Sequence, residues 1–281
     1  MRWKQFFTKA ESVDPEQARS MLQQTPVEQL TVLDVRQPSE YERGHIPGAK
    51  LIPLAELDKR LDELDPNQET LVYCAVGGRS RVGAQMLAGR GFDRVFNLKG
   101  GFKAWQGIGA YGPQDSGLEL FSGQESLKDT LVTAFGLEAG LRSFYLSMQS
   151  KVDRSSIQEL FAKLASIEEK HEQAIFDHYA RYVDGSLDRE RFESQVVGPA
   201  MEGGLSQEEY LNRFQADLGS ESEVIDLAMS IEGQALDLYL RAAERSGAEE
   251  SRDFLRKMAD EERHHLNRLG QLLDDRIEAS Q

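Results

Sequence analysis

The chain has 281 residues, of which 33 are Lys or Arg and 48 are Asp or Glu, so its formal net charge at pH 7 is −15. This acidic balance disfavours nucleic acids and anionic membranes as partners. The single cysteine excludes a disulfide framework within one chain and a four-cysteine iron site. No apolar run reaches the length of a membrane span, and the first residues lack the apolar region of a signal peptide. We therefore expect a cytoplasmic protein without a membrane partner.

Length and charge distribution predict two domains. Residues 1–112 carry 15 basic and 14 acidic residues, whereas residues 113–281 carry 18 basic and 34 acidic ones. The stretch between the halves is rich in Gly, Pro and Ser, which is typical of a linker. We predict a first domain at 1–110, a linker at 111–123 and a second domain at 124–281.

The first domain alternates between helical and extended segments. Helices are expected from Asp14 and at Ser39–Arg43, Ala55–Leu64 and Ser80–Arg90. Extended segments are expected at Thr31–Val35, Leu51–Pro53, Thr70–Cys74 and Arg94–Leu98. This alternation predicts an α/β fold with a small, mostly parallel sheet flanked by helices.

A loop with the sequence CAVGGRS joins the third of these strands to the next helix. Such a strand–loop–helix turn directs backbone N–H groups toward a bound anion, and Gly77 and Gly78 allow the backbone to wrap tightly. Amides and a nearby arginine favour a thiolate over a thiol, which indicates a nucleophilic rather than a structural cysteine. The expected catalytic residues are Cys74 and Arg79. The expected substrate-binding loop consists of Ala75, Val76, Gly77, Gly78 and Ser80.

These residues resemble single-domain rhodaneses, and the resemblance covers residues 13–106. Further matching segments are LDVR at 33–36, ERGHIPGA at 42–49 and GGFKAW at 100–105. The resemblance implies that Cys74 receives sulfane sulfur as a persulfide from thiosulfate or another persulfide and passes it to a thiol acceptor. Four residues separate Cys74 from Arg79, as in sulfurtransferases, whereas phosphatases of this fold carry one more.

Several residues near this loop have structural or open roles. Asp34 and Arg36 either orient the loop or form a structural ion pair. His45 lies in a turn motif, where we expect a structural role. Phe102 and Trp105 are expected to belong to the core.

The second domain contains an internal duplication of a helical hairpin, with an offset of 94 residues. Four long amphipathic helices are predicted, and the segment 184–222 joins the second to the third, with a short helix at Ser206–Asp217. The repeated pairs are Glu138 and Glu232, Tyr145 and Tyr239, Glu168 and Glu262, and His171 and His265.

The repeated glutamates lie on the apolar stripes of their helices, where unpaired carboxylates would be costly. Four glutamates and two histidines from four helices are expected to hold two metal ions. Their oxygen and imidazole ligands suit iron or manganese, and zinc less exclusively. The last helix offers two Glu-x-x-His pairs, and only Glu262 with His265, not Glu261 with His264, keeps the offset of 94. The predicted ligands are Glu138, Glu168, His171, Glu232, Glu262 and His265.

The motifs E-x6-Y and A-x-x-E-x-x-H, each present twice within 124–281, resemble the ferritin-like superfamily and in particular its rubrerythrin branch. The resemblance implies a four-helix bundle with a long crossover and two iron ions bridged by Glu168 and Glu262. The chain departs from that branch at Ala235, where a further Glu is usual, and in lacking a rubredoxin domain. Tyr145 and Tyr239 either pack in the core or hydrogen bond to ligands, and His178 is expected to pack or to support a ligand.

Together these observations predict a sulfurtransferase fused to a dinuclear iron domain that reduces peroxide or dioxygen with electrons from an external donor. We expect a homo-oligomer, most simply a dimer. Two alternatives stay open. The bundle could be a non-catalytic metal-binding or dimerisation module, or the protein could be a redox sensor in which oxidation of Cys74 reports on the metal site.

Overall fold

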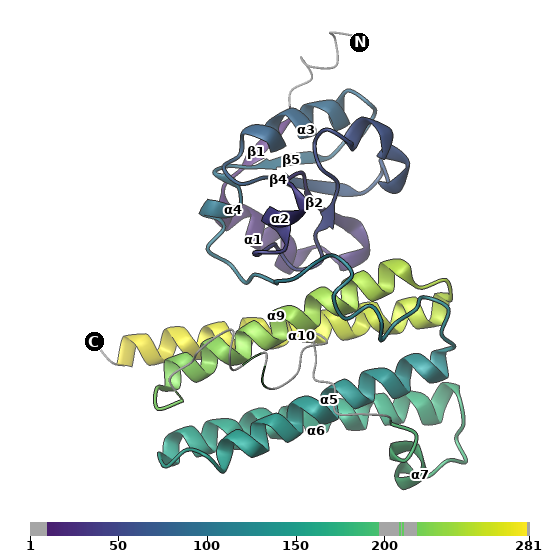
Figure 1. Cartoon of the computed structure of the whole chain (residues 1–281), viewed down its shortest axis with the longest axis vertical. Helices are drawn as coiled ribbons and strands as arrows, with labels where there is room; N and C mark the ends of the chain where they lie inside the picture. Colours follow the sequence, from purple (N-terminus) through teal and green to yellow (C-terminus); the bar gives the residue numbers. More distant parts are fainter. Residues whose placement is uncertain (1–9, 197–207, 209, 211–217, 280–281) are drawn as a thin grey trace. The chain divides into compact units, whose positions relative to one another are not determined.

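The computed structural model describes residues 10–196, 208, 210 and 218–279, and the chain divides into two compact units at residues 114 and 115 (Figure 1). The first unit is an α/β domain and the second is a helical bundle, as the sequence predicts.

The first unit contains a five-stranded sheet in the order β1-β5-β4-β2-β3, in which every pairing is parallel. The strands are β1 (Glu11–Val13), β2 (Leu30–Asp34), β3 (Lys50–Leu51), β4 (Glu69–Tyr73) and β5 (Val95–Leu98). The helices are α1 (Pro15–Gln24), α2 (Pro38–Tyr41), α3 (Gly78–Ala88) and α4 (Gly101–Ala104). The 3₁₀ turns are η2 (Val27–Gln29), η3 (Leu57–Lys59) and η4 (Leu61–Glu63).

Both faces of the sheet are buried, which is typical of parallel sheets. Successive residues of β4 point to opposite faces, so Leu71 and Tyr73 join one core cluster while Val72 joins the other. Cys74 belongs to the same cluster as Val72. The strand alternation therefore places the sulfur on a defined side of the sheet.

Three local features of the first unit differ from expectation. The predicted helix Ala55–Leu64 is wrong, because η3 and η4 replace it: no side chain caps either turn, and Arg60 between them leaves the helical region at φ −120° and ψ 23°. Strand β1 and helix α4 were not predicted, because three or four residues carry too little periodicity to be recognised.

The second unit contains four long helices, arranged as two hairpins in Figure 1. Helices α5 (Leu127–Gln149) and α6 (Ser155–Tyr182) form the first hairpin, and α9 (Glu221–Arg245) and α10 (Glu249–Ala279) form the second. Ser126 and Ser220 cap α5 and α9 through their hydroxyl groups. Apolar residues of all four helices meet in one core cluster. A short helix, α7 (Arg189–Glu193), follows α6. Of the predicted helix Ser206–Asp217, only residues 208 and 210 are described, and both are helical.

Residues 115–123, which the sequence assigns to a linker, pack on the second unit. The Phe121 ring lies edge-on to Tyr239 with 6.5 Å between centroids. The guanidinium of Arg241 donates to the Ser116 carbonyl at 2.9 Å, and the Gly247 N–H donates to the Gly123 carbonyl at 2.8 Å. The later part of the predicted linker is therefore an integral part of the helical unit.

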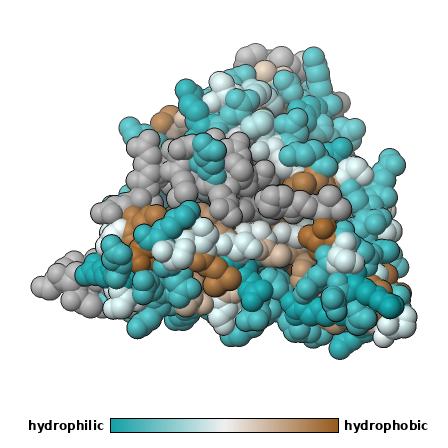
Figure 2. Space-filling model, turned by 60° about the horizontal axis from the view of Figure 1, so that its bottom comes forward, coloured by the Kyte–Doolittle hydropathy of each residue, from teal (hydrophilic) through white to brown (hydrophobic). Residues whose placement is uncertain are grey.

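Among the described residues, no helix is long and apolar enough to cross a membrane. On the face shown in Figure 2, hydrophilic residues predominate and hydrophobic ones form small, separate patches. This distribution agrees with helices whose apolar stripes face their neighbours.

Candidate active site and metal centre

The cysteine loop lies between the end of β4 and the start of α3, and it surrounds the sulfur of Cys74 with hydrogen-bond donors. The Gly77 N–H donates to Sγ at 3.1 Å, and the Ser80 hydroxyl lies 3.4 Å from Sγ. Burial, which leaves the residue 1% exposed, raises the pKa of the thiol. The hydrogen bonds from Ser80 and from the N–H groups of Val76 and Gly77 outweigh burial and hold the pKa of Cys74 below its usual value. The loop therefore stabilises a thiolate.

The lowered pKa of Cys74 gives a direct prediction. Since this is the only cysteine, the ultraviolet absorbance of a thiolate reports on it alone, and the midpoint of its titration should lie below that of an unperturbed cysteine thiol. Replacing Ser80 with alanine should move the midpoint upward, because the thiolate loses a donor. The Cys74→Ser variant is the blank. An unchanged midpoint in Ser80→Ala would show that the hydroxyl does not stabilise the charge.

The backbone of the loop rests on the segment GGFKAW. The Phe102 N–H donates to the Cys74 carbonyl at 2.7 Å, and the Lys103 N–H donates to the Ala75 carbonyl at 3.0 Å. Gly101 has a positive φ of 59°, and a Cβ there would lie 2.1 Å from the Cys74 carbonyl oxygen. The loop can keep this position only because residue 101 has no side chain. The sequence alone does not reveal this contact, because residues 74 and 101 are far apart in the chain.

The two loop glycines are not equivalent. Gly77 has a positive φ of 90°, and a Cβ there would lie 3.1 Å from the Gly100 nitrogen. Gly78 begins α3, and a Cβ there would meet nothing within 4 Å. The tight turn therefore requires a glycine at position 77. The expectation that it also requires a glycine at position 78 is wrong.

These contacts predict opposite outcomes for two alanine substitutions. Gly101→Ala should displace the loop and lower the kcat/KM of sulfur transfer by about tenfold or more, since misplaced reacting groups are costly. Gly78→Ala should leave turnover nearly unchanged and stabilise the first turn of α3 by up to about 1 kcal/mol. The kcat/KM of sulfur transfer and the thermal unfolding temperature are measured for each of the two variants. Equal effects of the two substitutions would contradict the assigned contact.

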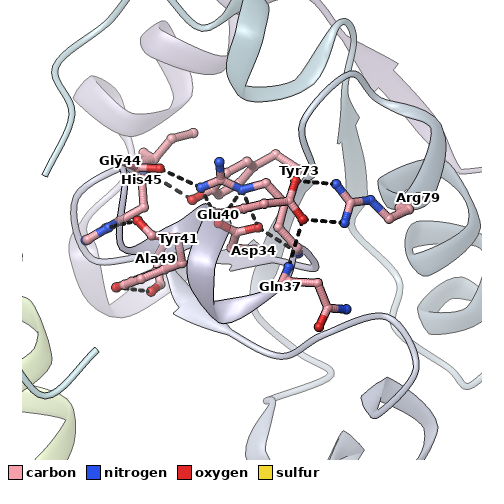
Figure 3. A network of polar contacts seen from close by, with 11 residues as sticks. Asp34, Gln37, Glu40, Tyr41, Gly44, His45, Ala49, Tyr73 and Arg79 are labelled. Atoms are coloured by element: carbon pink, nitrogen blue, oxygen red, sulfur yellow. Dashed lines mark hydrogen bonds and ion pairs between the residues drawn. The ribbon is translucent and has the colours of Figure 1, made fainter. Parts of the chain in front are cut away.

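Arg79, which the sequence assigns to anion binding, forms a bidentate ion pair with Glu40 of α2 (Figure 3). Both N–O distances are 2.7 Å. The hydrogen bonds from the guanidinium lower the pKa of Glu40 to about 2. Glu40 was missed in the sequence, because it lies 39 residues before Arg79. A bidentate pair restricts the orientation of the guanidinium, so Glu40 positions Arg79 beside the cysteine loop.

The buried pair of Asp34 and Arg36 is structural, which decides between the two roles that the sequence left open. The Arg36 Nε donates to the Asp34 carboxylate at 2.8 Å, and its Nη2 donates to the Gly44 carbonyl at 2.7 Å. The guanidinium also lies over the Phe102 ring, 4.6 Å from the centroid. The pair thus ties the end of β2 to the turn at Gly44.

The other aromatic residues of this region have packing roles, as expected. His45 stacks on Tyr41 with 3.6 Å between ring centroids. The indole N–H of Trp105 donates to the Ile108 carbonyl at 2.8 Å, and Phe102 packs against the core cluster that contains Trp105.

The six predicted metal ligands converge inside the helical unit. Each of the four glutamates is at most 1% exposed, and His265 is 6% exposed. The Nδ1 atom of His171 lies 3.0 Å from Glu138 and 3.3 Å from Glu168. The imidazole rings of His171 and His265 stack with 4.4 Å between centroids. Four helices contribute: Glu138 is on α5, Glu168 and His171 on α6, Glu232 on α9, and Glu262 and His265 on α10.

The protein alone does not supply hydrogen-bond partners for all the oxygens of these carboxylates. Both oxygens of Glu168 and the Oε2 atom of Glu232 are buried without a hydrogen-bond partner. Burial raises the pKa of Glu168 well above its usual range, and the nearby carboxylates of Glu232 and Glu138 raise it further. Burial opposes protonation of His171, but the neighbouring carboxylates of Glu138 and Glu168 raise its pKa to about 11. Buried unpaired carboxylates are costly unless a cation neutralises them.

The donor set fits a pair of metal ions. One ligand atom from each of Glu138, Glu168 and His171 lies within 4.8 Å of the others, and the same is true of His171, Glu262 and His265. Carboxylate and imidazole ligands suit iron or manganese. The residues present therefore fit the dinuclear centre that the sequence predicts.

The structure also distinguishes the two Glu-x-x-His pairs of α10. Glu262 and His265 are buried at the centre, whereas Glu261 and His264 are exposed on the helix surface. The offset of 94 residues selects the buried pair.

Residues around the ligands differ in their roles. The Tyr239 hydroxyl donates to Glu138 at 3.0 Å, so this tyrosine orients a predicted ligand. Tyr145 packs against Phe161 with 6.3 Å between centroids. His178 packs against Phe254, and Ala235 is buried at 1% exposure.

A rhodanese-type cysteine loop and a carboxylate-rich four-helix centre thus occur in one chain, and comparison with known families agrees. Residues 14–108 match the family model described as rhodanese-like domain, and residues 129–273 match the one described as rubrerythrin. The second match spans more than half of the chain. The chain belongs to the rubrerythrin family and carries a rhodanese-like domain before the rubrerythrin domain.

Two similar curated proteins each match just over a quarter of the chain. "Putative sulfur carrier protein YrkF" of Bacillus subtilis is 44% identical over 80 residues, which are 28% of this chain and 43% of that protein. "Uncharacterized protein YqhL" of the same organism is 45% identical over 76 residues, which are 27% of this chain and 60% of that protein. The chain therefore spans about half the length of these relatives.

Two similar solved structures each match about a third of this chain. A rhodanese-like domain protein from Staphylococcus aureus is 28% identical, with 34% of this chain and 90% of that chain covered and a TM-score of 0.31. The Alr3790 protein from Anabaena sp. is 32% identical, with 36% of this chain and 80% of that chain covered and a TM-score of 0.34.

Proposed function

We propose that the protein is a sulfurtransferase in which Cys74 carries sulfane sulfur as a persulfide, joined to a dinuclear iron domain that reduces peroxide or dioxygen. The observation that supports the first part is the set of donors around the Cys74 sulfur, which lowers the pKa of the thiol. The observation that supports the second part is the group of buried carboxylates, some of whose oxygens have no hydrogen-bond partner.

Sulfur transfer at Cys74 would proceed in two displacements. The thiolate attacks the sulfane sulfur of thiosulfate or a persulfide, the S–S bond of the donor breaks, and sulfite or a thiolate leaves with the bonding electrons. The N–H groups of Val76 and Gly77 face the sulfur during this step. A thiolate acceptor then attacks the outer sulfur of the persulfide and restores the Cys74 thiolate. Arg79, held by Glu40, supplies positive charge beside the anionic donor.

The helical unit would hold two iron ions through Glu138, Glu168, His171, Glu232, Glu262 and His265. When bound, the two ions supply the two electrons that peroxide reduction requires. Tyr239 holds the carboxylate of Glu138 in place through its hydroxyl group. Apolar side chains of all four helices form one core cluster within the same unit. The chain's only cysteine cannot form a rubredoxin-type iron site, so the electrons come from an external donor.

A turnover experiment tests the second part of this proposal. The iron-loaded chain should consume hydrogen peroxide only when a reductant is supplied. Cys74→Ser should leave the rate unchanged, because this cysteine is no part of the metal centre. Peroxide loss is measured against iron content for both proteins. A diferrous protein that reacts with neither peroxide nor dioxygen would support a non-catalytic bundle instead, the role favoured by Ala235. A rate lost in Cys74→Ser at unchanged iron content would show that the persulfide feeds the metal centre or that Cys74 senses it.

We also propose a cytoplasmic homodimer. A lone cysteine that acts as a nucleophile suits a reducing compartment, and the family resemblance favours self-association. Light scattering of the purified chain measures its mass, and a monomeric mass at micromolar concentration would refute the dimer.

A further inference from the structure

Two cavities open between α6 and α10 beside the carboxylate–histidine centre. One has a volume of about 260 Å³ and reaches His171 and His265. The other has a volume of about 150 Å³ and reaches Glu232 and His265. Ile167 and Arg268 line both of them. The two cavities therefore lead from the surface to three of the six predicted metal ligands.

Positive charge is concentrated on the walls of these cavities. Lys163 lines the smaller cavity, Lys170 and Lys257 line the larger one, and Arg268 lines both. These four side chains belong to exposed residues, and none of them forms an ion pair with a described residue. Among the described residues that line the walls, the acidic ones are the ligand Glu232 and Glu261.

The overall composition does not explain this cluster of positively charged side chains, because acidic residues outnumber basic ones by 34 to 18 in residues 113–281. Exposed lysines on a helix are usually solvated, but solvation does not explain why these four side chains surround the openings to one centre. Converging cations in a concave site attract anions and raise their local concentration. A neutral ligand such as hydrogen peroxide gains nothing from them.

We propose that these cavities admit a small sulfur oxyanion, of the class of sulfite and thiosulfate, to the metal centre. The choice of sulfur anions rests on the proposed function, because displacement from thiosulfate at Cys74 releases sulfite. The volume of about 260 Å³ is below the range of roughly 300–1,000 Å³ for sites of drug-sized ligands, so a small anion fits. The carboxylates of the metal-free centre repel an anion, whereas two divalent cations neutralise them. Anion binding should therefore require bound metal.

The test is a calorimetric titration with sulfite of the metal-loaded full chain carrying Cys74→Ser, which prevents sulfur chemistry. In this background, Lys257→Gln with Arg268→Gln should weaken binding at the bundle by about tenfold, or 1.4 kcal/mol. Lys151→Gln removes an exposed lysine of the bundle that lines neither cavity and should change nothing. The cysteine loop contributes equally in all these proteins, so differences between them report on the bundle. Removal of metal with a chelator should abolish the same binding event.

Binding that is equal in the double variant and the Lys151→Gln control would overturn the proposal, and so would binding that survives metal removal. If the double variant loses metal, Lys163→Gln with Lys257→Gln repeats the test with two exposed residues. A wild-type chain that transfers sulfur and holds two metals, yet binds sulfite only at the cysteine loop, would refute this inference and leave the proposed function intact. A wild-type chain that holds no metal would refute the proposed function itself.

Discussion

Replacing Cys74 with serine is expected to abolish sulfur transfer, lowering the rate of thiocyanate formation from thiosulfate and cyanide on the order of 10³-fold or more. The hydroxyl has nearly the shape of the thiol, so the donors from Gly77 and Ser80 stay in place. A serine hydroxyl is not ionised near neutral pH and cannot displace sulfite from the donor, since the reactive species is the thiolate.

The same variant provides its own control. Its metal content should equal that of the wild type, because Cys74 and the metal ligands lie in different units of the chain. Sulfur transfer that persists at more than a few per cent, with metal content unchanged, would show that Cys74 is not the nucleophile.

Removing Glu168 should cost the chain most of its metal. Glu168 is fully buried among the other predicted ligands, where its carboxylate would help to hold the metal ions. Glu168→Ala should therefore lower the metal content from about two ions per chain to less than one. Elemental analysis after dialysis measures this. Glu261→Ala, which removes an exposed carboxylate one residue before Glu262, is the matched control and should retain the wild-type content.

The metal-free protein should respond in the opposite direction. Burial and the nearby carboxylates of Glu232 and Glu138 raise the pKa of Glu168, so folding without metal at neutral pH requires this carboxyl to take up a proton, which costs free energy. Glu168→Gln keeps the shape and is always neutral, so it should raise the free energy of unfolding by about 1–3 kcal/mol. Urea unfolding of the helical unit in the presence of a chelator measures this. With metal bound, the wild type should be the more stable protein. If metal-free Glu168→Gln is less stable than the metal-free wild type, the Glu168 carboxyl stabilises the fold through a contact with the protein itself. This result would contradict its assignment as a group whose function is to bind metal.

Much of this protein can be predicted from its sequence, because the decisive patterns are local or repeated. An apolar run ending in Cys74 and followed by glycines defines the strand–loop–helix turn that holds the sulfur. A glutamate and a histidine three residues apart must share a helix face, and the offset of 94 residues indicates that the two hairpins are equivalent. That repeat also selects Glu262 over Glu261, and the structure buries Glu262 and exposes Glu261.

Other features were decided only by tertiary structure, because they depend on contacts between segments far apart in the chain. Glu40 and Arg79 are 39 residues apart and meet only when α2 lies beside the cysteine loop. Gly101 contacts the Cys74 carbonyl because β4 and β5 are neighbours in the sheet. Residues 115–123 have a composition typical of linkers, but their packing contacts make them part of the helical unit. Local sequence determines which chemical groups the chain presents, whereas the packing of distant segments determines how those groups are oriented and supported.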